Sequence, residues 1–312
     1  MKNIQLLNKI AKCGTDIFDK DLYNVADTVE NPDAIMVRSA VMHDMEFGDN
    51  LKAIARAGAG VNNIPLDRAA EEGIVVFNTP GANANAVKEL VIGALMLSSR
   101  KVAAAYDWCK TLKGEGDAVG KLVEKGKSQF AGPEIMGKTL GIIGLGAIGV
   151  KVANAAHALG MNVIAYDPFV TDKALFENDG VVAVGSVEEL YAASDFLSLH
   201  IPATAETKGS IGYDLAMSMP KGATIVNTAR KEVINEEGLM KAMEEREDLK
   251  YVTDIAPDAK DVYAEKFGKR YFGTPKKQGA ETAEANVNAG LAAANQIVDF
   301  FTTGNKKFQV NK

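Results

Sequence analysis

Three glycines carry the clearest chemical signal in this chain of 312 residues. Gly144, Gly146 and Gly149 have the spacing GxGxxG, and they separate the apolar run 140–143 from a helical pattern. In such a turn the first glycine permits the tight bend, the second lets a pyrophosphate approach the backbone, and the third lets the helix lie against the strand. Free N–H groups at the start of the helix then face the phosphates. The spacing therefore predicts a site for a dinucleotide.

An aspartate at the end of the next apolar run makes this prediction more specific. Asp167 follows the run 163–166 and lies 18 residues beyond Gly149. A carboxylate at this distance can bond the ribose hydroxyls of an adenosine. It would repel a 2′-phosphate, so we expect NAD rather than NADP. The alternative is a glycine-rich packing turn with a strand-capping aspartate, but the complete series of strand, turn, helix, strand and acid favours nucleotide binding.

Strands and helices alternate on both sides of this unit, which predicts parallel sheets. Apolar runs that suit strands occur at 4–7, 34–37, 53–56, 74–77, 181–184, 196–199, 223–226 and 251–253. Helical patterns occur at 66–72, 84–100, 235–245 and 283–301. We therefore expect an α/β protein with two doubly wound parallel sheets, whose ligands bind at the carboxyl ends of the strands.

The length predicts about two domains, each with its own core. We assign residues 1–95 and 285–312 to one domain and residues 96–284 to the other. Within the second domain, residues 101–137 fit no α/β unit and contain Trp108, the only tryptophan. This segment is either a loose linker or an arm that packs on a second subunit. A tryptophan at such a place favours the arm.

Composition and charge argue against several classes of function. Hydrophobic residues make up 47% and charged residues 24% of the chain, which is typical of globular proteins. The net charge of −6, without any block of Lys and Arg, argues against a nucleic-acid surface. Cys13 and Cys109 form no disulfide framework, and no cluster of His, Cys, Asp or Glu has metal-ligand spacing. The N-terminus is no secretory signal, and no run has the ~20 apolar residues that span a bilayer. We therefore expect a cytoplasmic protein.

Five residues at strand ends in the N-terminal part predict an anion site. Arg38 and Ser39 follow one strand, and Arg56, Gly58 and Gly60 follow the next. Two arginine forks and glycine backbone amides suit a substrate that carries both a phosphate and a carboxylate. Ordinary ion pairs at strand ends are the alternative.

Several longer motifs resemble those of the D-isomer-specific 2-hydroxy-acid dehydrogenases, in the order of that family. They are VRSA (37–40), ARAGAGVNNI (55–64), FNTPGANA (77–84), LGIIGLGAIG (140–149), LHIP (199–202), NTAR (227–230) and TP followed by a glycine (274–279). The resemblance covers nearly the whole chain and is greatest to short 3-phosphoglycerate dehydrogenases, which lack a C-terminal regulatory domain. It implies a flavodoxin-like substrate domain split between the chain ends, an inserted Rossmann domain that binds NAD, and a homodimer. It also implies oxidation of D-3-phosphoglycerate, a phosphorylated 2-hydroxy acid, at the head of serine synthesis.

The family's catalytic residues are only partly kept. Its carboxylate-binding arginine matches Arg230. A histidine normally follows TP, and its place here is either Lys276 or Lys277, because the segment is one residue longer than usual. The family's glutamate falls on Ala259, and Asp258 is the closest acid that could replace it.

A lysine can replace an imidazole–carboxylate pair on physical grounds. A histidine base needs a carboxylate to fix its tautomer, whereas an ammonium has no tautomer. The lysine pKa, about 10.4 in model peptides, must fall toward the working pH. Arg230 and an oxidised nicotinamide lower that pKa, and a carboxylate would raise it. We therefore expect Lys276 or Lys277 to exchange the substrate's hydroxyl proton. The alternative is two solvated lysines and an inactive site.

The cofactor side is expected to involve residues beyond the glycine turn. The resemblance implies contacts from Ala147, Ile148, His200, Pro202, Thr207, Thr228, Ala229 and Asp254. We expect His200 to be structural or adjacent to the cofactor rather than catalytic. Two other functions stay open. One is reduction of a different 2-keto acid, such as glyoxylate or hydroxypyruvate. The other is NADH sensing without catalysis, which the missing histidine and glutamate would favour.

Overall fold

Contacts divide the chain into two units, each built around one parallel sheet. The structure is a computed structural model, and it describes residues 1–169 and 180–312. The first unit comprises Met1–Ala86 and Ala280–Lys312, and the second comprises Val87–Gly279. The first unit is therefore assembled from both ends of the chain, with the second inserted between them.

Both boundaries lie earlier in the chain than residues 95 and 284, where the sequence analysis placed them. The helix α3 (Ala84–Arg100) accounts for the first difference, because Val87 and Leu95 pack in the core of the second unit. The helix begins in one unit and contributes most of its length to the other. Its periodic apolar pattern predicts the helix itself but not the sheet that covers its apolar face.

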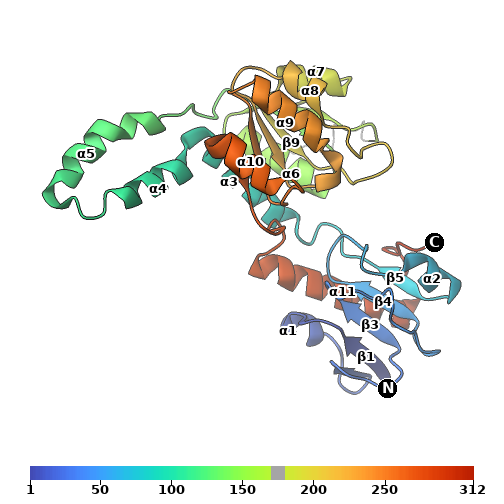
Figure 1. The fold of residues 1–312 in the computed structure, drawn as a ribbon. Helices are drawn as coiled ribbons and strands as arrows, with labels where there is room; N and C mark the ends of the chain where they lie inside the picture. Colours follow the sequence, from blue (N-terminus) through green and yellow to red (C-terminus); the bar gives the residue numbers. More distant parts are fainter. Residues whose placement is uncertain (170–179) are drawn as a thin grey trace. The chain divides into compact units, whose positions relative to one another are not determined.

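The first unit contains a five-stranded sheet in which neighbouring strands are parallel (Figure 1). Its strands are β1 (Lys2–Leu6), β2 (Tyr23–Ala26), β3 (Ala34–Val37), β4 (Ala53–Arg56) and β5 (Val75–Phe77), in the order β2-β1-β3-β4-β5. All four side chains of β3 are buried, as in a parallel strand that is covered on both faces. The helices are α1 (Lys12–Thr15), α2 (Leu66–Glu71) and α11 (Ala283–Thr303), with α2 and α11 in different cores.

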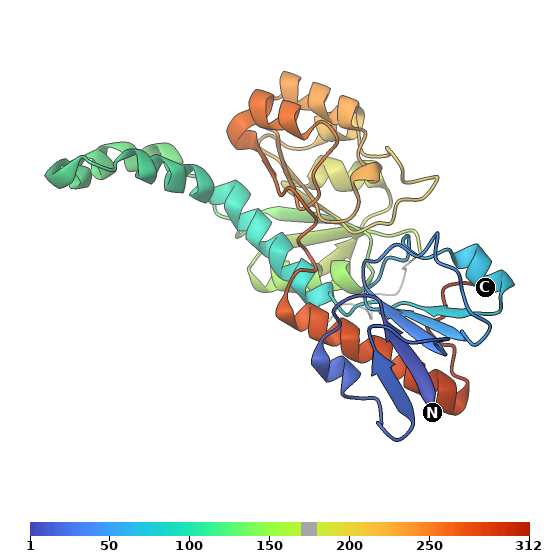
Figure 2. The same ribbon diagram turned by 60° about the horizontal axis from the view of Figure 1, so that its bottom comes forward.

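The long helix α11 lies along this sheet, and its ends are fixed locally (Figure 2). At its start the hydroxyl of Thr282 accepts a hydrogen bond from the Ala285 amide at 3.0 Å. At its end Gly304 takes a left-handed conformation, φ 74°, that a glycine adopts without strain. Helix α1 packs closely against it, because a Cβ added to Gly14 would lie 2.7 Å from the carbonyl carbon of Gly290.

The second unit contains a seven-stranded sheet, again with parallel neighbours. Its strands are β6 (Thr139–Ile143), β7 (Asn162–Tyr166), β8 (Val181–Ala183), β9 (Phe196–Leu199), β10 (Thr224–Asn227), β11 (Lys250–Thr253) and β12 (Tyr271–Gly273), in the order β12-β11-β10-β9-β6-β7-β8. The strand order reverses at β6, which has β7 on one side and β9 on the other. Ligands of such sheets bind at the carboxyl ends beside that reversal. The predicted α/β class with two parallel sheets is confirmed.

Helices pack in two cores of the second unit. They are α6 (Ala147–Ala158), α7 (Val187–Ala193), α8 (Tyr213–Ser218), α9 (Glu236–Glu245) and α10 (Lys260–Phe267), with the 3-10 helices η4 (Lys231–Val233) and η5 (Gly268–Arg270). The sequence patterns did not predict α8 or α10. Helix α10 depends on tertiary contacts, since the Tyr263 ring lies 5.6 Å from that of Tyr251 and 5.0 Å from that of Tyr271, both outside the helix. Within the described part of the chain, no helix has both the length and the apolar character needed to cross a bilayer.

Residues 101–137 are folded rather than a loose linker. They contain α4 (Val102–Thr111) and α5 (Val119–Gly126), with the 3-10 helices η1 (Gly116–Ala118) and η2 (Lys127–Phe130). Figure 1 shows α4 and α5 as two legs of an arm that extends from the second unit. The Trp108 ring on α4 packs against the segment that follows α5, with its centroid 5.2 Å from that of Phe130 in η2. No residue from 101 to 134 is buried.

Candidate functional site

The three glycines of the turn after β6 meet three different requirements. Gly144 has a φ of +92°, and a Cβ there would lie 2.6 Å from the carbonyl oxygen of His200. A Cβ on Gly149 would lie 2.0 Å from the oxygen of Gly144, so only glycine lets α6 approach the turn. A Cβ on Gly146 would meet no atom within 4 Å. The backbone at Gly146 is thus open to a ligand, as the GxGxxG spacing predicts.

The start of α6 offers backbone donors at this open position. Gly146 is the N-cap and has no side chain with which to cap the helix. The first amides of a helix have no acceptor within the helix, and here these include Ala147 and Ile148. They can donate to a phosphate, and the helix dipole favours the negative charge.

Asp167 follows β7 and ties the glycine turn to the neighbouring strand. Its Oδ2 accepts from the Leu145 amide at 2.7 Å, and its Oδ1 accepts from the Phe169 amide at 2.9 Å. The carboxylate is therefore held beside the turn, at the end of the strand where an adenosine ribose is expected. Each oxygen keeps acceptor capacity for a hydroxyl.

His200 follows β9 as a neutral imidazole. Burial lowers its pKa from 6.5 to about 4. Its Nε2 pairs with the hydroxyl of the buried Ser198 at 2.9 Å, and its backbone amide donates to Ile143 at 2.8 Å. A few residues later the Thr207 hydroxyl donates to the carbonyl of Pro202 at 2.6 Å, which closes a compact loop. These contacts fit a structural role beside the glycine turn.

Two cations meet at one carbonyl oxygen after β10. The Arg230 Nη1 donates to the oxygen of Ala229 at 2.8 Å, and the Lys277 Nζ donates to the same oxygen at 2.8 Å. The Ala229 amide in turn donates to the Asn227 side chain at 3.0 Å. Beside them, the buried hydroxyl of Thr228 has no hydrogen-bond partner among the described residues. The fold brings Arg230 and Lys277 together although they lie far apart in the sequence.

The two lysines that the sequence left open are in different environments. The Lys277 side chain reaches the Ala229 carbonyl, as described above. Both residues are exposed, and the backbone oxygen of Lys276 accepts from the Thr274 hydroxyl at 2.8 Å. The ammonium of Lys277 is the one that lies next to Arg230, at the carbonyl that both contact.

Asp254, at the end of β11, is a buried carboxyl close to this pair. Its Oδ2 accepts from the Gly279 amide at 2.6 Å, and its Oδ1 is buried without a hydrogen-bond partner among the described residues. Burial raises its pKa, while the Gly279 amide and the charge of Lys277 oppose that rise. The sequence argument put no acid beside the lysine. The structure has one, although its burial favours the protonated form.

Asp258 does not face these groups. Its carboxylate pairs with the Lys231 ammonium and is 78% exposed. The amides of Asp258 and Ala259 donate to the two carboxylate oxygens of Glu236, at 2.8 and 3.0 Å. The place of the family's glutamate is therefore the N-cap of α10, held by an acid on α9. The idea that Asp258 replaces that glutamate gains no support from this arrangement.

The first unit holds the loop after β3 through a side chain that the sequence analysis missed. The Oδ1 of Asn8 accepts from the amides of Arg38, Ser39 and Ala40 at 2.9, 2.8 and 3.0 Å. The Arg38 guanidinium makes an ion pair with Glu281, with 2.7 Å between Nη2 and Oε1. The only sequence signal for Asn8 is its place directly after the first strand.

The loop after β4 keeps its arginine close to the backbone. A Cβ added to Gly58 would lie 1.4 Å from Arg56 Nη1, and Gly58 has a φ of +147° that L-residues rarely adopt. The oxygen of Gly58 accepts from the Thr79 amide at 3.0 Å. Gly60 is half-buried in the same loop. Arg56 and Gly58 thus form one packed element, as a shared anion site requires.

Comparison with known proteins assigns the chain to a family. Residues 92–268 match the model of the D-isomer specific 2-hydroxyacid dehydrogenase NAD binding domain. The chain belongs to this family. The second unit of the chain therefore carries the family's NAD-binding domain, and the open backbone at Gly146 with the carboxylate of Asp167 fits that cofactor.

Relatives and solved structures agree with this assignment. The chain is 39% identical over 280 residues to D-3-phosphoglycerate dehydrogenase of Methanocaldococcus jannaschii, and the match covers 86% of this chain and 50% of the relative. It is 38% identical over 271 residues to hydroxypyruvate reductase of Thermotoga maritima, and this match covers 85% of the chain and 83% of the relative. The crystal structure of the NAD+-bound 3-phosphoglycerate dehydrogenase of Entamoeba histolytica is 40% identical in sequence and superposes with a TM-score of 0.81. The superposition covers 100% of this chain and 99% of that one. The chain spans about half the length of most curated phosphoglycerate dehydrogenases that it matches.

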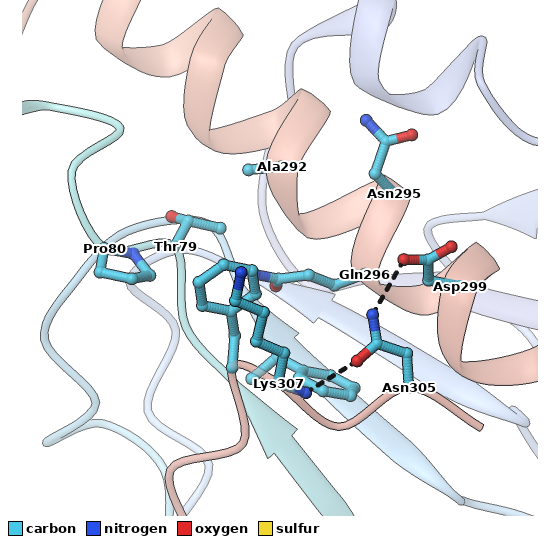
Figure 3. A pocket seen from close by; sticks show the side chains of 10 residues that line it. Thr79, Pro80, Ala292, Asn295, Gln296, Asp299, Asn305 and Lys307 are labelled. Atoms are coloured by element: carbon cyan, nitrogen blue, oxygen red, sulfur yellow. Dashed lines mark hydrogen bonds between the residues drawn. The ribbon is translucent and has the colours of Figure 1, made fainter. Parts of the chain in front are cut away.

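A separate pocket of about 220 Å³ lies in the first unit of the chain (Figure 3). It is lined by Phe77, Thr79, Pro80, Ala292, Asn295, Gln296, Asp299, Asn305, Lys307 and Phe308. Asn305 organises its rim, because its Nδ2 donates to Asp299 at 3.1 Å and its Oδ1 accepts from the Lys307 amide at 3.0 Å. None of the arginines singled out above lines this pocket.

Proposed function

We propose that the chain oxidises D-3-phosphoglycerate to 3-phosphohydroxypyruvate with NAD, the first step of serine synthesis. The observation that carries the proposal is the meeting of Arg230 and Lys277 at one carbonyl oxygen in an NAD-binding domain. The Arg230 guanidinium can bind a carboxylate, while the Lys277 side chain can donate or accept a proton. The names of the Methanocaldococcus and Entamoeba relatives support the choice of substrate.

Lys277 is proposed as the acid/base residue, in preference to Lys276. When bound, NAD supplies the acceptor for the hydride that leaves C2. The amine of Lys277 takes the proton of the C2 hydroxyl, and in the reverse direction the ammonium returns it to the keto oxygen. Its bond to Ala229 restricts where the amine can lie.

Arg230 is proposed to bind the substrate carboxylate. One of its Nη atoms is committed to the Ala229 carbonyl, which fixes the plane of the guanidinium. The remaining N–H groups can form a fork on a carboxylate. Arg38, Ser39, Arg56 and the backbone of Gly58–Gly60 are proposed to bind the phosphate, because Asn8 presets the first of these loops.

The cofactor contacts are proposed to follow from the groups that border the glycine turn. Asp167 would bind the ribose hydroxyls, and the backbone of Gly144–Gly149, including Ala147 and Ile148, would bind the pyrophosphate. The remaining proposed contacts are His200, Pro202, Thr207, Thr228, Ala229 and Asp254. The unpartnered hydroxyl of Thr228 and the unpartnered Oδ1 of Asp254 support their inclusion.

The test is NADH oxidation measured by absorbance with 3-phosphohydroxypyruvate, hydroxypyruvate and glyoxylate as separate substrates. We expect kcat/KM for the phosphorylated acid to exceed that for hydroxypyruvate by at least about tenfold, because only the former offers a phosphate to the arginines. A preference for hydroxypyruvate would favour the activity named for the Thermotoga relative. Tight NADH binding without turnover of any of the three acids would instead favour a sensing protein.

We also propose that the chain forms a homodimer through the arm of residues 101–134. An arm with no buried residue leaves its apolar side chains in water, including Val102 and Tyr106, at 55% and 65% exposure. A second copy that covers this surface would offset the cost of ordering the arm. The exposed, unpaired Cys13 and Cys109 fit a reducing compartment, so we propose a cytoplasmic location.

Excision of the arm should convert the protein to a monomer. A Cβ on Gly132 would lie 1.8 Å from the Ser99 oxygen, so the two ends of the arm adjoin and a short Gly–Ser linker can replace residues 101–131. Sedimentation velocity should give a dimer for the full chain and a monomer for the excised chain. NADH fluorescence is the control, because the glycine turn lies outside the arm. A dimer that survives the excision would contradict the proposal.

A further inference from the structure

Arg38 forms an ion pair with a carboxylate of the chain itself. Its Nη2 lies 2.7 Å from Glu281 Oε1, and both residues belong to the first unit. They are 243 positions apart in the sequence, so the fold and not local geometry brings them together. The side chains are 32% and 55% exposed, which leaves the pair within reach of solutes.

We propose that the Glu281 carboxylate competes with the substrate's phosphate for binding to Arg38. Its carboxylate occupies Arg38 in the free enzyme, the phosphate of the substrate replaces it, and it returns to the arginine as the phosphorylated product leaves. This inference rests on the proposed function for the identity of the substrate. The competition itself depends only on the contact between the two side chains.

The backbone on both sides of the pair is fixed, so the exchange involves side chains alone. On one side, the Asn8 oxygen holds the amides of Arg38 and Ser39. On the other side, Glu281 directly precedes Thr282, whose hydroxyl caps the start of α11. Rotation of the Glu281 side chain about its own bonds releases the guanidinium without any movement of the loop or the helix.

The charges decide which ligands displace Glu281. An exposed pair of single charges is weak. A phosphate monoester carries nearly two negative charges at pH 7 and three strong acceptor oxygens, so it binds the arginine better than a carboxylate does. A keto acid without a phosphate has only its carboxylate, which carries no more charge than Glu281 and which Arg230 is proposed to bind. The competition at Arg38 therefore favours phosphorylated substrates, and it limits how tightly the phosphorylated product is bound.

A sulfate titration tests the competition without using catalysis. Inorganic sulfate is titrated into the full chain, and the midpoint of thermal unfolding gives its affinity. Glu281→Gln should bind sulfate about two- to fivefold more tightly than the natural chain, the range expected for loss of an exposed pair. Glu284→Gln is the matched control, because Glu284 is exposed in the same segment and makes no ion pair with any described residue. In an Arg38→Ala background the effect of Glu281→Gln should vanish.

Steady-state kinetics then test the link to the substrate. For Glu281→Gln, the KM for 3-phosphohydroxypyruvate should fall by about two- to fivefold without a rise in kcat, and the KM for hydroxypyruvate should not change. Equal or weaker sulfate binding in Glu281→Gln would overturn the inference. Absence of turnover by the natural chain would reject the proposed function, while the sulfate result would still decide whether Glu281 competes at Arg38.

Discussion

Replacement of Lys277 by alanine should lower kcat for reduction of 3-phosphohydroxypyruvate by about 100- to 10,000-fold, the usual contribution of general acid–base catalysis. The reason is geometric. Lys277 donates to the Ala229 carbonyl that Arg230 also contacts, so its ammonium lies beside the arginine that we propose binds the acid. KM should change much less, because the arginines that are proposed to bind the acid are untouched. Stopped-flow measurement of NADH oxidation separates the hydride step from product release.

Lys276→Ala is the matched control, since that lysine is adjacent in sequence and exposed like Lys277. Its kcat should stay within about threefold of the natural value, as expected for a surface substitution. Small alkylamines should restore part of the activity of Lys277→Ala, because a diffusible ammonium can enter the space left by the side chain. The reverse pattern, with Lys276 essential and Lys277 dispensable, would refute the assignment. Full activity of the double variant would refute lysine catalysis altogether.

The choice between these lysines shows where sequence reasoning about the site reaches its limit. Motif spacing leads to both residues, because the loop has one additional position and nothing local determines which side chain turns inward. The choice depends on a contact with Ala229, 48 residues earlier. Similarly, the roles of Asn8 and Glu281 depend on Arg38, 30 and 243 positions away from them. No local pattern encodes partners at such separations.

Local patterns predicted the fold best where side chains are buried on every face. The strands β3, β4 and β9 have the predicted bounds, because each is an almost uninterrupted apolar run in the middle of a parallel sheet. The strand β2 (Tyr23–Ala26) was missed, since it lies at an edge and exposes Asn24. Helix α10 was missed because its buried aromatic residues are stabilised by distant rings rather than by a periodic apolar face.

Arg230 should have the second large effect, and it should act on kcat/KM. Arg230→Ala removes the bidentate contact that we propose for the substrate carboxylate, and each hydrogen bond to a charged group contributes about 1.5–3 kcal/mol. We expect kcat/KM for 3-phosphohydroxypyruvate to fall by about 100- to 1,000-fold, with much of the change in KM. Steady-state NADH oxidation over a range of keto-acid concentrations measures both parameters.

Two further variants separate the role of the guanidinium fork from that of positive charge alone. Arg230→Lys keeps the charge but loses the planar fork, so it should recover only part of the loss. Lys231→Ala is the control, because this neighbouring cation pairs with Asp258 in solvent and should leave kcat/KM within about threefold. Added guanidinium should restore activity to Arg230→Ala and not to Lys277→Ala. Full activity of Arg230→Lys would mean that Arg230 supplies only positive charge. The proposed site, in which a planar guanidinium binds the carboxylate and Lys277 transfers the proton, would then be wrong.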